Sequence, residues 1–230
     1  MKLEACHLSC GYGAGNVVAD ASFSLAGSEV LCLLGPNGVG KTTLFKAILG
    51  FLPARRGEVS IGRQSIAAMS RKKLARLVGY VPQVHEPPFP FEVLDVVVMG
   101  GVGRTNPFAS PSRERYAQAE HLLETLGVAY LRDRIYTEIS GGERQMILIA
   151  RALMQEPRFL VMDEPTSNLD FGNQMRVLAQ IENLAAQGVG IIMTSHFPDH
   201  AFLCATKVAL MSKSRPFLVG EAEAIITEDA

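Results

Sequence analysis

The sequence predicts an α/β fold that is interrupted by an all-helical insertion, and three observations support this. Apolar runs at residues 29–34, 159–162 and 189–194 have the length of buried strands. Helical patterns lie between these runs. The insertion is expected at about 84–156. The prolines at 82, 87, 88 and 90 forbid a helix where it begins, and mainly helical signals follow them as far as Pro157.

Composition restricts the function classes. The chain has 230 residues with 48% hydrophobic and 20% charged residues, a balance that excludes intrinsic disorder. A net charge of −1 does not supply the basic field of a non-specific nucleic-acid binder. No apolar run reaches the roughly 18 to 20 residues of a membrane span, and the N-terminal residues do not resemble a secretory signal. With four cysteines and no disulfide framework, we expect a soluble protein of the cytoplasm.

The first half of the chain predicts strands followed by two helices. Short alternating stretches broken by glycines predict strands and turns in the first thirty residues. The apolar run at 29–34 predicts a buried strand, and a helix is expected at 42–49, ended by Gly50. A second helix is expected at 70–78, where Ser70 provides the N-cap.

The second half predicts three longer helices. Helices are expected at 113–126 and 144–154 within the insertion, and at 173–186 between the two last predicted strands. Near the N-terminus, Cys6, His7 and Cys10 do not predict a metal site. Strand alternation would place Cys6 and Cys10 on one face and His7 on the other.

A phosphate-binding loop is predicted between the strand at 29–34 and the helix that follows it. The segment GPNGVGKTT, residues 35–43, fits the pattern G-x-x-x-x-G-K-[ST]. Its glycines let successive backbone N–H groups face phosphate oxygens, Lys41 would reach the β- and γ-phosphates, and Thr42 would ligate Mg²⁺. A glycine-rich turn without a ligand is the less favoured alternative. The predicted nucleotide-binding residues here are Gly35, Pro36, Asn37, Gly38, Val39, Gly40, Lys41, Thr42 and Thr43.

Two acidic residues follow the apolar strand FLVM at 159–162. Asp163 at the strand end suits the magnesium shell, and Glu164 suits activation of a water aimed at the γ-phosphate. Alone, an apolar strand that ends in two acidic residues would indicate only a strand that enters a solvated loop. Together with the phosphate-binding loop they favour a hydrolytic site for a nucleoside triphosphate.

The segment ISGGERQ, residues 139–145, opens a predicted helix. Ser140 and Glu143 have the spacing of a capping box. Gly141 and Gly142 weaken the first turn by roughly 1 kcal/mol each relative to alanine. Glycines are understandable there if the helix N-terminus must approach a backbone or an anion closely. The cap and the anion site are compatible interpretations.

In their order along the chain, these motifs together with His196 resemble the ATP-binding cassette (ABC) family of ATPases. The resemblance covers nearly the whole chain and implies a P-loop NTPase core, a small antiparallel β subdomain and an inserted all-helical subdomain. It implies one domain over 1–230, with the nucleotide-binding core at 1–83 and 157–230. The helical subdomain with the signature motif would occupy 84–156.

The resemblance also implies residue roles. It implies a head-to-tail dimer of two copies with ATP between the phosphate-binding loop of one and Ser140, Gly141, Gly142 and Glu143 of the other. Gln83 matches the Q-loop glutamine, which touches Mg²⁺ together with Thr42 and Asp163. His196 matches the switch histidine, Tyr12 the aromatic that stacks on adenine, and Asp170 the D-loop. The catalytic set is then Glu164, His196, Lys41 and Gln83.

By this resemblance, the expected function is the ATPase subunit of a membrane importer. Residues 89–100 and 169–178 resemble the iron-chelate, haem and cobalamin group, and the run HFPDHA resembles a branch that includes molybdate and tungstate carriers. The implied partners are polytopic permease subunits and, indirectly, a substrate-binding protein, with the chain peripheral on the inner face of the membrane and no nucleic acid bound. An ABC ATPase acting in DNA repair or translation is the alternative, whereas a P-loop kinase would leave ISGGE and His196 unexplained.

The sequence departs from the family pattern at a few positions. Ile139 and Glu143 stand where Leu and Gln are commoner. The chain stops at Ala230, where similar importer subunits continue into another short helix, so a C-terminal truncation is a hypothesis. The linker around Gln83 and residues 89–100 are apolar with no obvious core periodicity. We expect this stretch, with Phe89 and Phe91, to line a groove for a cytoplasmic helix of the permease.

Overall fold

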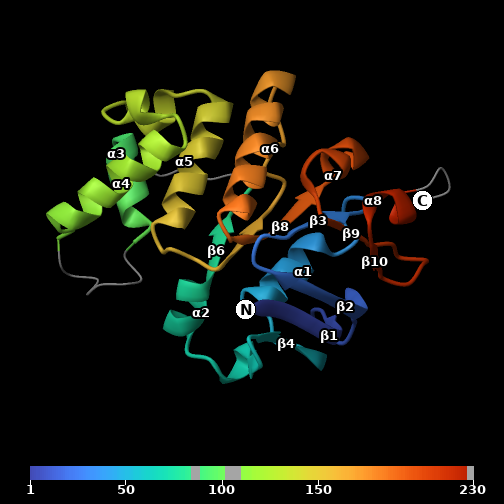
Figure 1. Ribbon diagram of the computed structural model, residues 1–230. Coiled ribbons are helices and arrows are strands. Elements are labelled where there is room, and N and C mark those ends of the chain that lie inside the picture. Colours follow the sequence, from blue (N-terminus) through green and yellow to red (C-terminus); the bar gives the residue numbers. More distant parts are fainter. Residues whose placement is uncertain (84–88, 102–109, 227–230) are drawn as a thin grey trace.

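The computed structural model describes residues 1–83, 89–101 and 110–226. In these ranges the chain forms two sheets flanked by helices (Figure 1). The strands are β1 (Lys2–Cys10), β2 (Val18–Ala26), β3 (Val30–Leu34), β4 (Arg56–Ile61), β5 (Gln64–Ser65), β6 (Val78–Val81), β7 (Phe159–Met162), β8 (Gly190–Ser195), β9 (Lys207–Leu210) and β10 (Leu218–Gly220). The α-helices are α1 (Lys41–Ile48), α2 (Arg71–Leu77), α3 (Val93–Met99), α4 (Arg113–Thr125), α5 (Gly141–Leu153), α6 (Phe171–Ala186), α7 (Pro198–Cys204) and α8 (Ala222–Ile225).

The larger sheet positions the candidate site. Its strand order is β10-β9-β3-β8-β7-β6, and the strands from β9 to β6 are parallel. Along β3, Val30, Cys32 and Leu34 pack into one hydrophobic core, whereas Leu31 and Leu33 pack into another. Burial on both faces explains the unbroken apolar run at 29–34. Because the strands are parallel, the segments that follow β3, β7 and β8 meet at one edge.

The smaller sheet is antiparallel, with strand order β2-β1-β4-β5, and its core is shared with α1. The alternation predicted for its first strand is wrong. The register of β1 shifts between Ala5 and Leu8 and again before Cys10, and His7 has a φ of 48°. This irregularity leaves Cys6 and His7 exposed and Cys10 buried.

Helices α3, α4 and α5 are grouped at one end of the molecule, away from β1 and β2 (Figure 1). All three lie within residues 84–156, where a single bridge between Glu92 and Ile135 is the strand-like pairing of the described residues. The limits of this unit stay a prediction. None of the helices in the described ranges has the length and apolarity that crossing a bilayer requires.

Helix boundaries lie close to the predicted ones, with one substantial difference. Helix α5 begins three residues before the predicted 144, and α6 begins at Phe171 rather than at 173. The apolar stretch 89–100 contains α3, on which Val93, Val96 and Val97 are each at most 2% exposed. The stretch therefore contributes to the core, although its sequence shows no core periodicity. A helix buried on most sides needs no polar face and so shows no amphipathic period.

Candidate functional site

The loop of residues 35–43 connects β3 to α1 and is shaped by three glycines. Gly35, Gly38 and Gly40 have φ angles of 153°, 72° and 117°, in the left-handed region that favours glycine. A Cβ on Gly35 would lie 2.5 Å from the carbonyl oxygen of Met211. The loop borders a cavity of about 200 Å³, which is lined by Val17, Asn37, Gly38, Gly40, Lys41, Thr42, Thr43 and Glu164.

Lys41 begins α1 and is only 6% exposed. Its Nζ donates hydrogen bonds to the carbonyl oxygens of Gly35, at 2.6 Å, and Pro36, at 3.3 Å. Burial lowers the pKa of the Lys41 ammonium, while the carboxylates of Glu164 and Asp163 act in the opposite direction. The ammonium is thus held inside the loop, at the wall of the small cavity.

The remaining predicted residues of the loop differ in what they present to the cavity. Asn37 and Thr43 line it. Val39 is 4% exposed and packs into the core around α1, and its N–H donates to the carbonyl oxygen of Pro36 at 3.4 Å. Val39 can therefore meet a ligand through its backbone alone.

Asp163 follows β7 and is held from two sides. Its Oδ2 accepts a hydrogen bond from Thr42 Oγ1 at 3.3 Å, and its Oδ1 accepts one from Thr194 Oγ1 at 3.0 Å. Thr194 lies on β8 and is fully buried. Thr194 was not among the predicted site residues, although its place near the end of a strand parallel to β7 was a usable signal.

Glu164 is the meeting point of three segments. Its backbone has a φ of 49°, and its N–H donates to Thr194 Oγ1 at 2.7 Å. Its Oε2 lies 2.8 Å from Gln83 Nε2 and 2.9 Å from His196 Nε2. Gln83 Nε2 also lies 3.2 Å from Ser167 Oγ. Residues that are 81 and 32 positions from Glu164 in the sequence (164 − 83 and 196 − 164) are thereby brought onto one carboxylate oxygen.

The donor set beside Glu164 fits a magnesium ion. Mg²⁺ prefers oxygen ligands at about 2.0–2.1 Å in octahedral geometry, which places adjacent ligand oxygens about 2.9 Å apart. Thr42 Oγ1 and Asp163 Oδ2, at 3.3 Å, are close to that spacing. Gln83, the third predicted ligand, uses its amide nitrogen on Glu164. Thr42 and Asp163 are thus the better placed of the three.

Tyr12 lies apart from these groups. Its ring is 52% exposed and is not part of the cavity wall. Lys46 Nζ lies 5.6 Å from the ring centroid, a cation–π geometry that holds the ring over α1. An exposed aromatic face in this place is available for stacking.

Ser140 caps α5 in the predicted capping box, which the structure confirms. Glu143 N–H donates to Ser140 Oγ at 3.3 Å, and Glu143 Oε2 accepts from Ser140 N–H at 2.8 Å. Hydrogen bonds from the Ser140 side chain and backbone lower the pKa of Glu143. Ser140 and Gly141 are exposed, so the N-terminus of α5 faces outward.

The two glycines of this motif have different surroundings. A Cβ on Gly142 would lie 2.4 Å from Asn173 Oδ1 on α6, whereas one on Gly141 would meet Leu169 Cδ2 at 3.4 Å. The contact that Gly142 permits is therefore with a side chain of α6 and not with a backbone or an anion. Asp170 caps α6 by accepting from Asn173 N–H at 2.9 Å, which lowers the pKa of Asp170.

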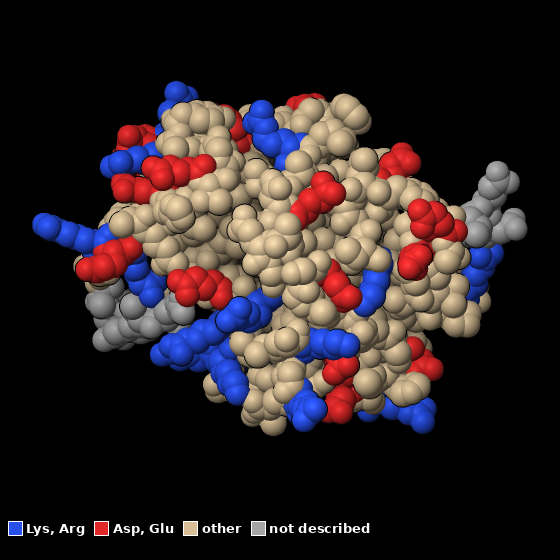
Figure 2. Space-filling model, viewed as in Figure 1, with Lys and Arg blue, Asp and Glu red and all other residues tan. Residues whose placement is uncertain are grey.

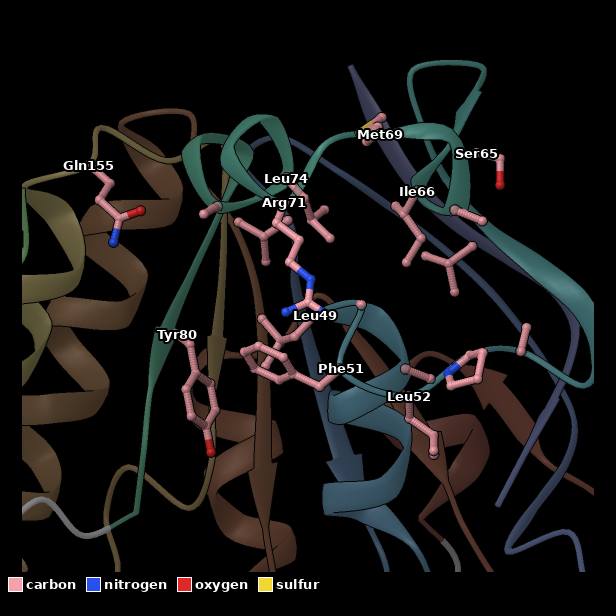
Figure 3. A pocket seen from close by; sticks show the side chains of 18 of the residues that line it. Leu49, Phe51, Leu52, Ser65, Ile66, Met69, Arg71, Leu74, Tyr80 and Gln155 are labelled. Carbon is pink, nitrogen blue, oxygen red and sulfur yellow. The ribbon is translucent and has the colours of Figure 1, made fainter. Parts of the chain in front are cut away.

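A second, much larger cavity of about 1120 Å³ lies between α2, the segment after α1, and α5. Figure 3 shows Arg71 of α2 pointing into this groove, with Phe51 and Tyr80 on its walls. Phe51 is 70% exposed. Figure 2 shows Lys and Arg side chains gathered over α2, which exposes Arg71, Lys72, Lys73 and Arg76. The apolar lining residues include Leu49, Phe51, Leu52, Ile66, Met69, Leu74 and Met99.

The groove coincides only in part with the predicted one. Met99 and Gly100 line it, but Phe89 and Phe91 do not. Phe91 packs against the hydrophobic core, and Phe89 is 62% exposed elsewhere on the surface. Phe89 and Phe91 are therefore not part of the wall of this groove, and their contact with a permease helix stays a prediction.

Comparison with known proteins identifies the family. The family model described as ABC transporter matches residues 18–167. An uncharacterized ABC transporter ATP-binding protein of Haemophilus influenzae is 38% identical over 227 residues, which cover 99% of this chain and 86% of that protein. The molybdate import ATP-binding protein MolC of the same species is 36% identical over 209 residues, covering 90% of this chain and 77% of MolC.

A solved structure gives the same result for the fold. A chain of an ABC transporter described as of the metal-chelate type, in an inward-facing conformation, superimposes with a TM-score of 0.88. It is 35% identical, and the match covers 99% of this chain and 85% of the other. The predicted α/β class with an antiparallel sheet and a helical insertion is confirmed. The chain belongs to the ABC transporter family and is one of its ATP-binding and ATP-hydrolysing subunits.

Proposed function

We propose that the chain hydrolyses ATP to drive import of a metal complex or an oxyanion through partner permease subunits. The molybdate importer subunit and the metal-chelate type transporter among its relatives support this cargo class, which includes iron-siderophore, haem, cobalamin, molybdate and tungstate. The alternative role in DNA repair or translation is not favoured, because these relatives belong to transporters. The partner subunits contact the cargo, and this chain supplies the energy.

One observation carries the hydrolytic part of the proposal. Gln83 and His196 both approach Oε2 of Glu164, beside the cavity of the phosphate-binding loop. Among the described residues Glu164 Oε1 has no hydrogen-bond partner, so this oxygen is left to accept a proton. A carboxylate whose second oxygen is fixed and whose first is free suits a general base.

The other residues hold the substrate in place. The backbone N–H groups of residues 35–43 and the positive end of α1 bind the phosphates, and Lys41 Nζ moves from the Gly35 carbonyl to the β- and γ-phosphates. Thr42 and Asp163 hold Mg²⁺. When bound, Mg²⁺ neutralises charge that develops on the phosphate oxygens. Tyr12 stacks on adenine.

A second copy of the chain completes the ATP site. Ser140 and Gly141 are exposed at the N-terminus of α5, a helix of 13 residues whose dipole favours an anion there. In the opposing copy this N-terminus covers the γ-phosphate that the phosphate-binding loop holds. Asp170, next to the α5–α6 contact at Gly142, belongs to the same dimer surface.

The groove of Figure 3 receives a short cytoplasmic helix of the permease, which keeps the chain at the inner face of the membrane. A helix with its side chains is about 10–12 Å across and rises 5.4 Å per turn, so about 1120 Å³ accommodates roughly two turns. Phe51, Met69 and Met99 would pack on its apolar face. Arg71 has no hydrogen bond or ion pair within the described residues, so a carboxylate on the docking helix would be its partner.

Replacing Glu164 tests the hydrolytic assignment. Glu164→Gln keeps the size and the hydrogen bonds from Gln83 and His196 but cannot accept a proton. ATP hydrolysis should fall by about 10² to 10⁴, or roughly 3 to 5 kcal/mol of barrier, while ATP affinity is preserved. The control Glu124→Gln alters an exposed glutamate of α4 and should hydrolyse ATP normally. Wild-type turnover in Glu164→Gln would remove Glu164 from the mechanism.

A further inference from the structure

A second histidine lies behind the loop that carries His196. His200 is on α7 and only 5% exposed. Its Nδ1 lies 3.0 Å from Ser195 Oγ and 3.3 Å from Thr166 Oγ1. Both hydroxyl residues are buried, at 2% and 3% exposure. A buried imidazole between two buried hydroxyls is held by specific contacts and does not merely fill space.

The two hydroxyls belong to the two segments that carry the proposed catalytic pair. Ser195 ends β8 directly before His196, and its Oγ accepts a hydrogen bond from the N–H of Phe197 at 3.0 Å. The backbone on both sides of His196 is therefore tied to the atom that His200 contacts.

Thr166 lies two residues after Glu164, in the turn where Ser167 N–H donates to the Glu164 carbonyl oxygen at 3.0 Å. The imidazole thus spans from the His196 loop to the Glu164 turn.

The surroundings keep the imidazole in place. The rings of His200 and Phe197 lie with centroids 5.2 Å apart, and the carbonyl oxygen of His200 accepts from Cys204 Sγ at 3.2 Å. Burial lowers the pKa of His200, while the Asp199 carboxylate acts in the opposite direction and His196 lowers it further. The hydroxyls of Ser195 and Thr166 can exchange hydrogen bonds with His200 Nδ1.

We propose that His200 is a positioning residue, which holds the His196 loop against the Glu164 turn through Ser195 and Thr166. The contact fixes the distance of 2.9 Å between His196 Nε2 and Glu164 Oε2. The inference rests on the proposed function of that pair. Small displacements of groups that orient a reaction lower its rate steeply, by up to about a hundredfold for 1 Å.

Two amide substitutions distinguish positioning from simple filling. The side-chain amide of His200→Asn lies near the position of Nδ1, whereas that of His200→Gln reaches farther, near Nε2. The kcat for ATP hydrolysis should stay within about threefold of wild type in His200→Asn and fall roughly ten- to a hundredfold in His200→Gln. KM for ATP should change little in either variant, because the side chain at position 200 does not contact the phosphates in the proposed site. Phe202→Ala, an exposed position on the same helix, is the control.

A second pair of variants changes Thr166, which His200 contacts. This pair still tests the inference if the variants at position 200 do not fold. Thr166→Val keeps the shape without the hydroxyl and should lower kcat, whereas Thr166→Ser should retain it. Equal kcat in His200→Asn and His200→Gln, or in Thr166→Val and Thr166→Ser, would overturn the inference. A loss of ATP affinity that parallels the loss of kcat would overturn it as well.

Glu164→Gln, measured in the same assay, distinguishes a failure of the positioning role of His200 from a failure of the proposed function. If Glu164→Gln loses activity while the variants at 200 and 166 do not, the positioning role fails and the proposed function stands. If Glu164→Gln keeps wild-type activity, the proposed function itself fails.

Discussion

The edge of the parallel sheet and the beginning of α5 differ in how complete each is within one chain. At the sheet edge, Asp163 and Glu164 are each bonded by two or more side chains from other segments. At α5, Ser140 bonds to Glu143 of its own helix and is exposed. The side chains of the sheet edge are thus held together within one chain, whereas α5 presents a capped and exposed N-terminus. The proposed chemistry therefore lies in a region that one chain completes, whereas the proposed contact with a second copy lies at an exposed helix end.

Lys41→Ala changes the site at the sheet edge, the more complete of the two regions, and should have the largest effect. Removing the ammonium takes away the charge nearest the phosphates, so ATP binding should weaken and turnover should fall by at least about 10²-fold. The fold should persist, because Lys41 Nζ bonds only to the loop itself. Lys213→Ala, which changes an exposed lysine outside the site, is the control for a steady-state ATPase assay. Near-normal ATPase activity in Lys41→Ala would contradict the assignment of the loop.

Phe51→Asp would extend the comparison to the groove. A carboxylate placed in an apolar interface costs about 3 kcal/mol or more, so permease affinity should fall by more than about a hundredfold. ATPase activity of the isolated chain should be unchanged. Phe89→Asp changes an equally exposed phenylalanine that lies outside the groove and should leave the complex intact. Co-purification with a co-expressed permease measures both, and equal binding by the two variants would place the interface elsewhere.

Gly142→Ala would sharpen what the α5 region contributes to the fold. The added Cβ meets Asn173 at 2.4 Å, whereas the Cβ of Gly141→Ala meets nothing closer than 3.4 Å. Both changes gain helix propensity, so the difference between them isolates the close contact with α6. Gly142→Ala should be less stable than Gly141→Ala by about 1–3 kcal/mol in urea unfolding. Equal stabilities would show that Asn173 of α6 moves aside without lowering the free energy of unfolding.

Glu143→Gln should have the smallest effect. The lowered pKa of Glu143 means that the ionised carboxylate stabilises the folded state above the ordinary carboxyl pKa range. That contribution is lost as the pH falls through the lowered pKa. Because the side chain is largely solvated, its loss at neutral pH should be no more than about 0.5 kcal/mol, and it should vanish in acid. Unfolding curves at neutral and acidic pH would check this, and a difference that grows in acid would contradict it.

Local patterns predicted the site where its residues are contiguous. Residues 35–43 and the strand before Asp163 carry their own structural context, a strand on one side and a turn or helix on the other. The capping box at Ser140 was readable for the same reason. The positions of Gln83, Tyr12 and His196 came only from the resemblance to a family, because no local pattern relates them to Glu164.

Features that depend on tertiary packing were missed. Helix α3 is buried on most sides and so has no amphipathic period. The irregular register of β1 leaves Cys6 exposed beside His7 and separates it from the buried Cys10, whose face it was expected to share. The need for glycine at position 142 is set by Asn173, which is 31 residues away (173 − 142). No sequence pattern singled out His200, because its partners lie on two other segments.

The proposed dimer, in which the two compared regions would meet, is tested most directly by size-exclusion chromatography with ATP and Mg²⁺. Glu164→Gln should trap ATP between the phosphate-binding loop of one copy and Ser140 of the other, and it should therefore elute as a dimer. The wild-type chain without a permease should elute as a monomer. The double variant Glu164→Gln, Ser140→Arg should also elute as a monomer, because arginine blocks the closed interface. A double variant that still dimerises with ATP would contradict the shared site.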